Sequence, residues 1–159
     1  MGIKVYTDGS AKGNPGKGGY GIVIQENGKR REISKGYRMT TNNRMELLAV
    51  IIALESIKES SEEIVITSDS KYVIDAITKR WVFGWEKKGF KKKKNPDLWK
   101  RFLRVYPKHK LIFKWIRGHS GHLENERCDE LAVNASTYSD LEIDTYFEKI
   151  KEPPPNLFS

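Results

Sequence analysis

The pattern of hydrophobic and polar positions predicts a β-sheet that starts at the N-terminus. Residues 3–7 are rich in β-branched and aromatic side chains, which favour a strand, and residues 9–16 predict a glycine-rich loop after it. A second strand is expected over residues 19–25, and Asn27-Gly28 is typical of a hairpin turn that leads to a third strand over residues 30–38. We therefore expect an antiparallel meander of three strands.

The rest of the chain alternates helical and strand patterns. A wide apolar stripe from Met45 to Ile57, preceded by the N-cap residues 40–43, predicts a well-buried helix. The apolar run 64–67 is typical of a buried parallel strand, and residues 110–116 predict another strand. Further helices are expected over residues 72–77, 98–105 and 125–135, with an amphipathic turn around 143–150. This order predicts an α/β fold in which a mixed sheet carries helices on its faces.

Length and composition indicate one polar globular domain. The chain has 159 residues, of which 38% are hydrophobic and 31% charged. No apolar run approaches the roughly 18 residues that a membrane helix needs. The sequence enters a strand at once, so no signal peptide is expected, and the single cysteine, Cys128, cannot form an internal disulfide. These features favour a cytoplasmic protein without a membrane association.

The charge balance favours a polyanionic partner. Lysine and arginine number 29 against 21 acidic residues, which gives a net charge of +8 and a sequence pI near 9.5. Basic side chains gather over residues 79–99 and are interleaved with aromatic ones. Such a segment is typical of nucleic-acid binding, whereas its plainer interpretation is a solvated lysine-rich loop.

Four acidic residues stand at positions where a site is expected. Asp8 and Asp69 each follow an apolar strand, and the carboxyl ends of neighbouring parallel strands meet at one edge of a sheet. Glu46 interrupts an apolar helical face, and Asp129 lies near the start of the last long helix. Each has an ordinary explanation: a turn cap for Asp8, complementation of the helix dipole for Glu46, and a solvated helix start for Asp129.

Taken together, the four acids predict a metal-dependent nuclease. Crowded carboxylates repel one another unless cations hold them, and ligation by oxygen alone suits Mg²⁺ or Mn²⁺ better than zinc. Two such ions can activate a water molecule and stabilise the leaving oxygen of a phosphodiester. His119, between two glycines, is a candidate for proton transfer, although a surface loop histidine is equally compatible with its spacing. His109, His122 and Cys128 are expected to be structural.

Several separated motifs resemble type 1 ribonuclease H, and in particular the bacterial ribonuclease HI enzymes. They run from Ile3 to about Ala135 in the order found in that family. The motifs are Thr7-Asp8-Gly9-Ser10 with Gly13-Asn14-Pro15-Gly16 and Gly19-Tyr20-Gly21, Thr40-Thr41-Asn42-Asn43-Arg44-Met45-Glu46-Leu47, Thr67-Ser68-Asp69-Ser70-Lys71-Tyr72-Val73, Gly118-His119-Ser120-Gly121-His122, and Asn125-Glu126-Arg127-Cys128-Asp129-Glu130-Leu131-Ala132.

The resemblance implies a ribonuclease H-like fold with a five-stranded mixed sheet, three strands antiparallel and the others parallel. It implies endonucleolytic hydrolysis of the RNA strand in RNA–DNA hybrids, leaving 5′-phosphate and 3′-hydroxyl ends. It further implies Mg²⁺, with Mn²⁺ as an alternative, bound as two ions when substrate is present. The implied ligands are Asp8, Glu46, Asp69 and Asp129, with His119 assisting proton transfer or product release.

The resemblance also assigns residues to the two strands of the substrate. Asn14, Asn42 and Asn43 would follow the RNA strand, because their amides can both donate to and accept from a 2′-hydroxyl. On the DNA side, Tyr72 and Trp81 would line the groove. Residues expected to hold backbone phosphates are Thr41, Asn95, Lys87, Lys88 and Lys91. Lys71 is a further substrate-binding candidate that departs from the family pattern and could either add a phosphate contact or hinder one.

This sequence departs from the family pattern at two positions near the expected phosphate contacts. Met39 stands where a basic residue often precedes the phosphate-binding threonine, with Arg38 beside it, and Lys71 stands where glutamine is common in the bacterial enzymes. The motifs cover a catalytic domain over residues 1–136, with a basic protrusion at about 81–95, and leave residues 137–159 as a partly disordered extension. A monomer without an obligate protein partner is expected.

Two other classes of protein remain compatible with the fold expected here. A non-catalytic nucleic-acid-binding module could use the same fold, but it would gain nothing from four acids that repel phosphate. A DNA-cutting relative, such as a transposase or integrase core, is the other alternative. The asparagine-rich candidates for 2′-hydroxyl recognition and the compact single domain count against it.

Overall fold

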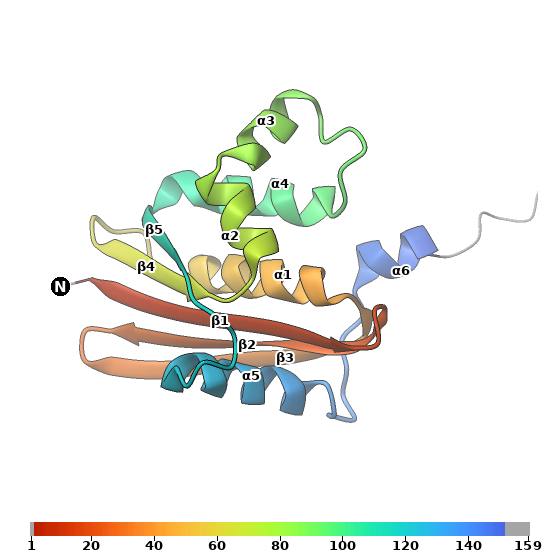
Figure 1. Ribbon diagram of the computed structural model, residues 1–159, viewed down its shortest axis with the longest axis horizontal. Helices are drawn as coiled ribbons and strands as arrows, with labels where there is room; N and C mark the ends of the chain where they lie inside the picture. The colour runs from red at the N-terminus through yellow and green to blue at the C-terminus, as the bar shows by residue number, and fades with distance from the viewer. Residues whose placement is uncertain (1, 152–159) are drawn as a thin grey trace, which may run out of the picture.

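A five-stranded mixed sheet organises the chain in the computed structural model, which describes residues 2–151 (Figure 1). The strand order is β3-β2-β1-β4-β5, with β1 antiparallel to β2, β2 antiparallel to β3, and β1, β4 and β5 mutually parallel. The strands are β1 (Ile3–Lys12), β2 (Gly16–Glu26), β3 (Lys29–Thr40), β4 (Glu63–Ser68) and β5 (Lys110–Trp115). The expected five-stranded α/β architecture is confirmed.

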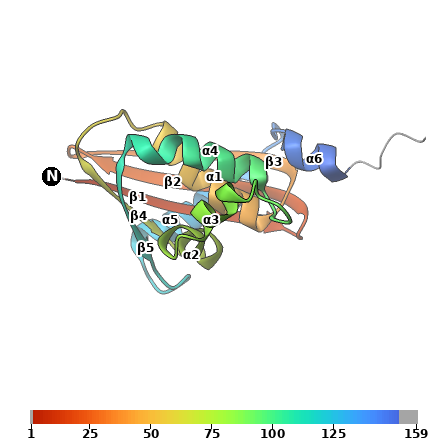
Figure 2. The same ribbon diagram turned by 90° about the horizontal axis from the view of Figure 1, so that it is seen from above.

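Helices cover both faces of the sheet. In Figure 1, α5 lies on one face, and α1 lies on the other beneath α2, α3 and α4; Figure 2 shows the upper layer from above. The helices are α1 (Asn42–Glu55), α2 (Lys71–Thr78), α3 (Trp81–Lys87), α4 (Pro96–Val105), the short 3₁₀ turn η1 (Tyr106–Lys108), α5 (Leu123–Ala135) and α6 (Thr145–Lys151). Among the described residues, no helix is long and apolar enough to span a bilayer.

Helix α1 is the central element of the core. Its N-cap is Thr41, whose hydroxyl accepts a hydrogen bond from the backbone N–H of Arg44 at 3.2 Å, as the run of capping residues predicted. From Arg44 to Leu54 nearly every side chain is buried, because α1 lies between the sheet and the upper layer that contains α4. A helix buried on all sides carries apolar residues all round, which explains its wide stripe.

The prediction of a glycine-rich loop over residues 9–16 is wrong in its extent. Strand β1 continues to Lys12, paired with β2, and the chain reverses only over residues 13–15. The reason for glycine at position 9 is the close approach of α1: a Cβ there would collide with the backbone of Met45 and Glu46. Gly9 therefore serves helix–strand packing rather than a loop.

Glycines on the opposite face let α5 approach the sheet. A Cβ on Gly19 would lie 2.6 Å from the carbonyl oxygen of Ala132, and one on Gly21 would collide with that of Cys128. Because helix α5 rests directly on β2 here, Cys128 and the residue that follows it lie close to the sheet. Asp129 is that residue.

The basic segment contains a helix that sequence patterns did not predict. Residues 81–87 form α3. Three aromatic side chains and a glycine within these seven residues leave no apolar spacing typical of a helix. Residues with positive φ, including Arg80 at 62° and Asn95 at 60°, separate α3 from α2 and α4. The segment is therefore a short helix with an irregular turn after it, and its Val82 and Phe90 are buried in the hydrophobic core.

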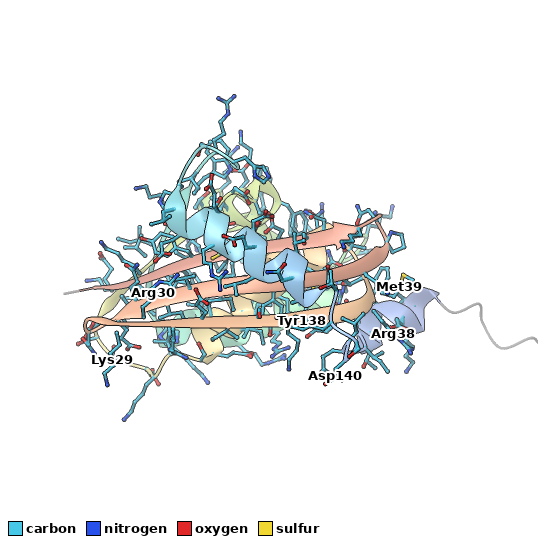
Figure 3. The ribbon with its side chains drawn as sticks, turned by 90° about the horizontal axis from the view of Figure 1, so that it is seen from below. Lys29, Arg30, Arg38, Met39, Tyr138 and Asp140 are labelled. Carbon is cyan, nitrogen blue, oxygen red and sulfur yellow. The ribbon has the colours of Figure 1, made fainter. Side chains whose placement is uncertain are left out.

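The described part of the C-terminal extension is attached to the end of β3. Glu142 donates its N–H to the carbonyl oxygen of Gly36 at 2.8 Å and accepts from the N–H of Arg38 at 3.0 Å. Figure 3 shows Arg38 and Met39 at this end of the sheet, beside α6. Helix α6 occupies the region where an amphipathic turn was expected; the proline run 153–155 lies outside the described residues.

Candidate active site and nucleic-acid interface

Three of the predicted acids meet at the carboxyl end of the parallel strands. Asp8, Glu46 and Asp69 each offer a carboxylate oxygen, and these atoms all lie within 4.8 Å of one another. The parallel register pairs Tyr6 with Thr67, which brings Asp8 and Asp69, two residues further along, to the same place. Asp8 and Glu46 are both only 6% exposed, so the surrounding protein covers most of these two side chains.

Glu46 is fixed in the cluster by the backbone of β1. Its Oε1 accepts a hydrogen bond from the N–H of Gly9 at 2.6 Å. The close approach that requires glycine at position 9 is therefore the same contact that orients this carboxylate. Glu46 lies beyond the first turn of α1, so complementation of the helix dipole does not explain it.

Asp69 is held from the side of β5. Its backbone carbonyl oxygen accepts a hydrogen bond from Nε1 of Trp115 at 3.0 Å. Gly118 approaches the carboxylate so closely that a Cβ there would lie 2.6 Å from Oδ2. The ammonium of Lys71 stacks over the Trp115 ring at 4.8 Å, so the lysine predicted to bind phosphate stands on the tryptophan that positions Asp69.

Asp129 joins the site from the other face of the sheet. It lies on α5 and acts electrostatically on Asp8. The pKa of Asp8 is raised from its ordinary 3.8 to about 8, first by burial and then by the charges of Asp69 and Asp129. Burial, followed by the charges of Asp8 and Asp69, also raises the pKa of Glu46, while the Gly9 N–H opposes the rise.

The donor set fits a hard divalent cation. Three converging carboxylates, two of them buried, without cysteine or imidazole in the group, are the ligands that Mg²⁺ and Mn²⁺ prefer. The raised pKa of Asp8 agrees with this, because burial and the charge of Asp69 both disfavour its ionised form when no cation is bound. A bound cation would relieve the repulsion that otherwise favours protonation.

The three histidines occupy different environments. His119 is exposed, has a φ of 53°, and follows directly on Gly118, which abuts Asp69. His122 caps α5 by accepting from the N–H of Asn125 at 3.4 Å, and Nε2 of His109 bonds the carbonyl oxygen of Leu54 at 3.0 Å. The last two therefore have the structural roles expected of them, whereas His119 stands beside the acidic cluster.

The residues predicted to follow the RNA strand gather where the β1–β2 turn meets the start of α1. The Asn14 side chain accepts a hydrogen bond from the backbone N–H of Asn42 at 3.1 Å, which joins the two segments. The side chains of Asn14, Asn42 and Asn43 are exposed. These amides thus gather at the N-terminal end of α1, the helix that carries Glu46.

The predicted DNA-side residues form a second connected group. Asn95 donates from Nδ2 to the hydroxyl of Tyr72 at 3.0 Å, and that hydroxyl also accepts from Nε1 of Trp99 at 3.0 Å. Thr41 and Asn95 line one cavity of about 460 Å³. Trp81 is 48% exposed at the start of α3, with the ammonium of Lys79 over its ring.

The lysines of the basic segment are exposed on and after α3. Lys87, Lys88 and Lys91 all point to solvent, and Lys93 stacks over Trp85 at 5.0 Å. This aromatic support distinguishes the segment from a loose lysine-rich loop.

Sequence reasoning missed one cluster beside this group. Arg44 is only 2% exposed and forms ion pairs with Asp97, through Nη2, and with Asp144, through Nε, each at an N–O distance of 2.7 Å. A basic residue inside the apolar stripe of α1 was the available signal, because a buried guanidinium requires carboxylate partners. Asp144 could not be named as the partner, since it lies 100 residues away in the chain.

Comparison with known proteins defines the class to which this fold and site belong. The RNase H family model matches residues 2–137. The chain is 50% identical over 151 residues to a ribonuclease H of Trichodesmium erythraeum, covering 92% of this chain and 96% of that protein. It is 48% identical over 151 residues to a ribonuclease HI of Shewanella oneidensis, covering 92% and 94% respectively.

Solved structures agree with this assignment. LC9-RNase H1, described as a type 1 RNase H with the type 2 active-site motif, superposes with a TM-score of 0.75 at 34% identity, covering 96% of this chain and 81% of that one. LC11-RNase H1, solved in complex with an RNA/DNA hybrid, gives a TM-score of 0.63 at 31% identity, with 84% and 95% coverage. The chain belongs to the RNase H family, and the predicted resemblance to type 1 ribonuclease H is confirmed.

Proposed function

We propose that the protein hydrolyses the RNA strand of RNA–DNA hybrids at the cluster formed by Asp8, Glu46, Asp69 and Asp129. Membership of the RNase H family establishes the class of activity, a hydrolytic endoribonuclease that acts on hybrids. The observation that carries the assignment to this site is the convergence of three carboxylates within 4.8 Å. By family likeness the products carry 5′-phosphate and 3′-hydroxyl ends.

The four carboxylates would hold divalent metal, Mg²⁺ first and Mn²⁺ as the alternative, with two ions when substrate is present. Such ions supply an activated water molecule and charge stabilisation at the leaving oxygen. The Gly9 N–H and the Trp115 indole orient Glu46 and Asp69 before substrate arrives, which lowers the cost of assembling the site.

The proton leaving the site has a candidate carrier in His119. It is exposed, sits on the loop that contacts Asp69, and belongs to the residue type that is suited to proton transfer at neutral pH. We assign it to proton transfer or product release.

Selectivity for the hybrid follows from two surfaces on either side of the acids. Asn14, Asn42 and Asn43 present amides that pair with 2′-hydroxyl groups, which only the RNA strand carries. Tyr72 and Trp81 face the DNA strand, and phosphate contacts come from Thr41, Asn95, Lys71, Lys87, Lys88 and Lys91. Phosphate and sugar contacts carry no base sequence, so sequence preference is expected to be weak.

A non-catalytic binding module on this fold is disfavoured by the acids themselves. A surface for phosphate gains nothing from a cluster of carboxylates in which burial and the neighbouring acids raise the pKa of Asp8 to about 8. We also propose that the protein acts as a monomer in the cytoplasm, with which the free Cys128 is compatible.

Cleavage of matched substrates tests this proposal. The RNA–DNA hybrid, double-stranded RNA and double-stranded DNA of one sequence are incubated with enzyme and Mg²⁺, with Mn²⁺, or with chelator. We expect cleavage of the RNA in the hybrid alone, abolished by chelator. Tight binding to the hybrid without cleavage in either metal would favour the binding module, and cleavage of the DNA duplex would favour a DNA-cutting relative.

A further inference from the structure

Asn95 stands at a helix start without capping it. It is the N-cap residue of α4, yet its side chain makes no hydrogen bond to the α4 backbone. Asparagine is favoured at this position because its oxygen normally accepts from the first turn. Here that oxygen accepts from Nη1 of Arg44 at 3.2 Å, while the amide nitrogen donates to Tyr72. The amide is therefore held for another purpose.

The orientation of this amide is fixed by its partners. Arginine has only donors, so the atom of Asn95 that faces Arg44 must be the oxygen. The amide nitrogen then keeps one N–H beyond its bond to Tyr72. The Tyr72 hydroxyl already accepts from Asn95 and Trp99, which leaves its own proton to donate. The second N–H of Asn95 and the hydroxyl proton of Tyr72 are therefore two neighbouring donors. Arg44 fixes which end of the Asn95 amide is the donor end.

Arg44 is in turn held from the C-terminal extension. Its Nε and Nη2 donate to Asp144 at 2.7 and 2.9 Å, and Asp144 is only 7% exposed. Asp144 also accepts from the hydroxyl of Thr40 at 2.7 Å, the residue before Thr41. One buried carboxylate of the extension thus bonds Thr40, the neighbour of Thr41, and Arg44, the partner of Asn95, and both Thr41 and Asn95 line one cavity.

Helix α6 completes that cavity. Tyr146, Phe147 and Ile150 line it together with Asn14, Thr41 and Asn95, and Lys93 and Lys94 add positive charge. The Arg44 guanidinium lies 5.4 Å from the Tyr146 ring. The basic side chain at the end of β3 does not line this cavity: Arg38 pairs with Glu148 of α6 at 2.8 Å, and position 39 is methionine. Positive charge near the cavity therefore comes from Lys93 and Lys94.

We propose that the C-terminal extension takes part in substrate binding through Asp144, a positioning residue which, through Arg44, aims Asn95 at one phosphodiester of the DNA strand. This inference rests on the proposed function, because it specifies how that site holds its substrate. It goes beyond the motifs, which end at about Ala135 and leave the extension without a role.

The test compares Asp144→Asn with Glu148→Gln on hybrids whose DNA strand carries one neutral methylphosphonate at successive positions. Binding is measured by fluorescence anisotropy in the Asp8→Asn background, and KM and kcat are measured with Asp8 intact. In the wild type we expect one position where the methylphosphonate weakens binding about tenfold, the scale of one charged hydrogen bond.

In Asp144→Asn we expect KM on the unmodified hybrid to rise about five- to tenfold, with kcat within about twofold of the wild type. A methylphosphonate at the sensitive position should then weaken binding no further, because the contact is already lost. Glu148→Gln removes a surface ion pair of the same helix and is expected to keep the full methylphosphonate effect. A lower melting temperature of Asp144→Asn with an unchanged KM and an intact methylphosphonate effect would overturn the proposal, leaving Asp144 purely structural.

A second variant covers the case in which Asp144→Asn does not fold. Arg44→Lys keeps a cation between Asp97 and Asp144 but cannot also reach Asn95, so it should abolish the methylphosphonate effect in the same way. Retention of that effect in Arg44→Lys would contradict the relay. If the wild type bound the hybrid with the methylphosphonate signature yet failed to cleave it, the proposed function would fall while the positioning role of Asp144 stood.

Discussion

At the scale of single residues, the site is a concentration of negative charge held in place before any cation binds. The N–H of Gly9 fixes Glu46, and the indole of Trp115 holds the backbone at Asp69. Burial and neighbouring acids raise the pKa of Asp8 to about 8. The metal-free protein therefore stores electrostatic repulsion that cation binding releases, which is a common compromise between stability and activity.

The raised pKa of Asp8 predicts how stability depends on pH. The native state keeps a proton that the unfolded chain, with an ordinary pKa of 3.8, has already released. The free energy of unfolding of the metal-free protein should therefore fall as pH rises from about 4 to about 8. Thermal melting in chelator across this range is the measurement, and addition of Mg²⁺ at about pH 8 should restore the stability.

Replacing Asp8 by asparagine removes this repulsion. We expect Asp8→Asn to stabilise the metal-free protein at about pH 8 by roughly 2 kcal/mol, or about 6 °C in melting temperature, and to make it insensitive to Mg²⁺. Near pH 4 the variant and the wild type should melt together, since Asp8 is then protonated in the native state. Equal melting temperatures at the higher pH would show that Asp8 carries no such strain.

At the scale of elements, close packing brings acids from separate segments together. Strands β1 and β4 bring Asp8 and Asp69 to one edge, α1 contributes Glu46, and α5 contributes Asp129 from the other face. Glycines where the helices touch the sheet set how near those helices can come. The position of a carboxylate is therefore decided partly by residues that have no chemistry of their own.

Gly21→Ala tests the role of α5 packing. A Cβ at position 21 would collide with the carbonyl oxygen of Cys128, the residue before Asp129. We expect a decrease of about 1–3 kcal/mol in unfolding free energy, together with reduced kcat because Asp129 moves. The matched control is Gly84→Ala in α3, where a Cβ meets nothing and should be neutral or slightly stabilising. Full activity of Gly21→Ala would separate Asp129 from the helix packing.

The elements show which features a sequence can predict. The strands, α1 and the acids at strand ends were predictable because periodicity and position reflect local rules. Strand β1 was predicted too short because Gly9 was interpreted as a loop signal. In the structure Gly9 belongs to the strand, and glycine is needed there because α1 packs closely against it. The Arg44–Asp144 ion pair joins residues 100 apart in the chain, and each alone resembles an ordinary charged residue.

At the scale of the whole molecule, acidic and basic regions are separated. The acids lie at the carboxyl end of the sheet, while lysines gather on α3 and the turn that follows it. The lysine-rich region would attract a polyanion, and the acidic cluster would cleave it. Affinity and chemistry are thus expected to respond to different residues.

Replacing Lys91, Lys92, Lys93 and Lys94 with serine tests this separation. All four are exposed, so the fold should tolerate the change. We expect KM to rise and its dependence on salt to flatten by roughly 0.7–0.9 in logarithmic slope for each phosphate that a lysine no longer neutralises, with kcat little changed. Lys29→Ser, at the end of the sheet away from α6 in Figure 3, is the control. The same salt slope in both variants would mean that the lysine run does not touch phosphate.

The central claim is that Asp8 and its neighbouring acids drive cleavage of the RNA strand. Its most direct test is the single-turnover rate of one RNA–DNA hybrid with saturating enzyme, in Mg²⁺, for the wild type and Asp8→Asn. We expect the rate to fall about a thousandfold or more, with Kd for the hybrid within about threefold of the wild type. A rate within about tenfold of the wild type would contradict it, because Asp8 would then be no part of the catalytic metal site.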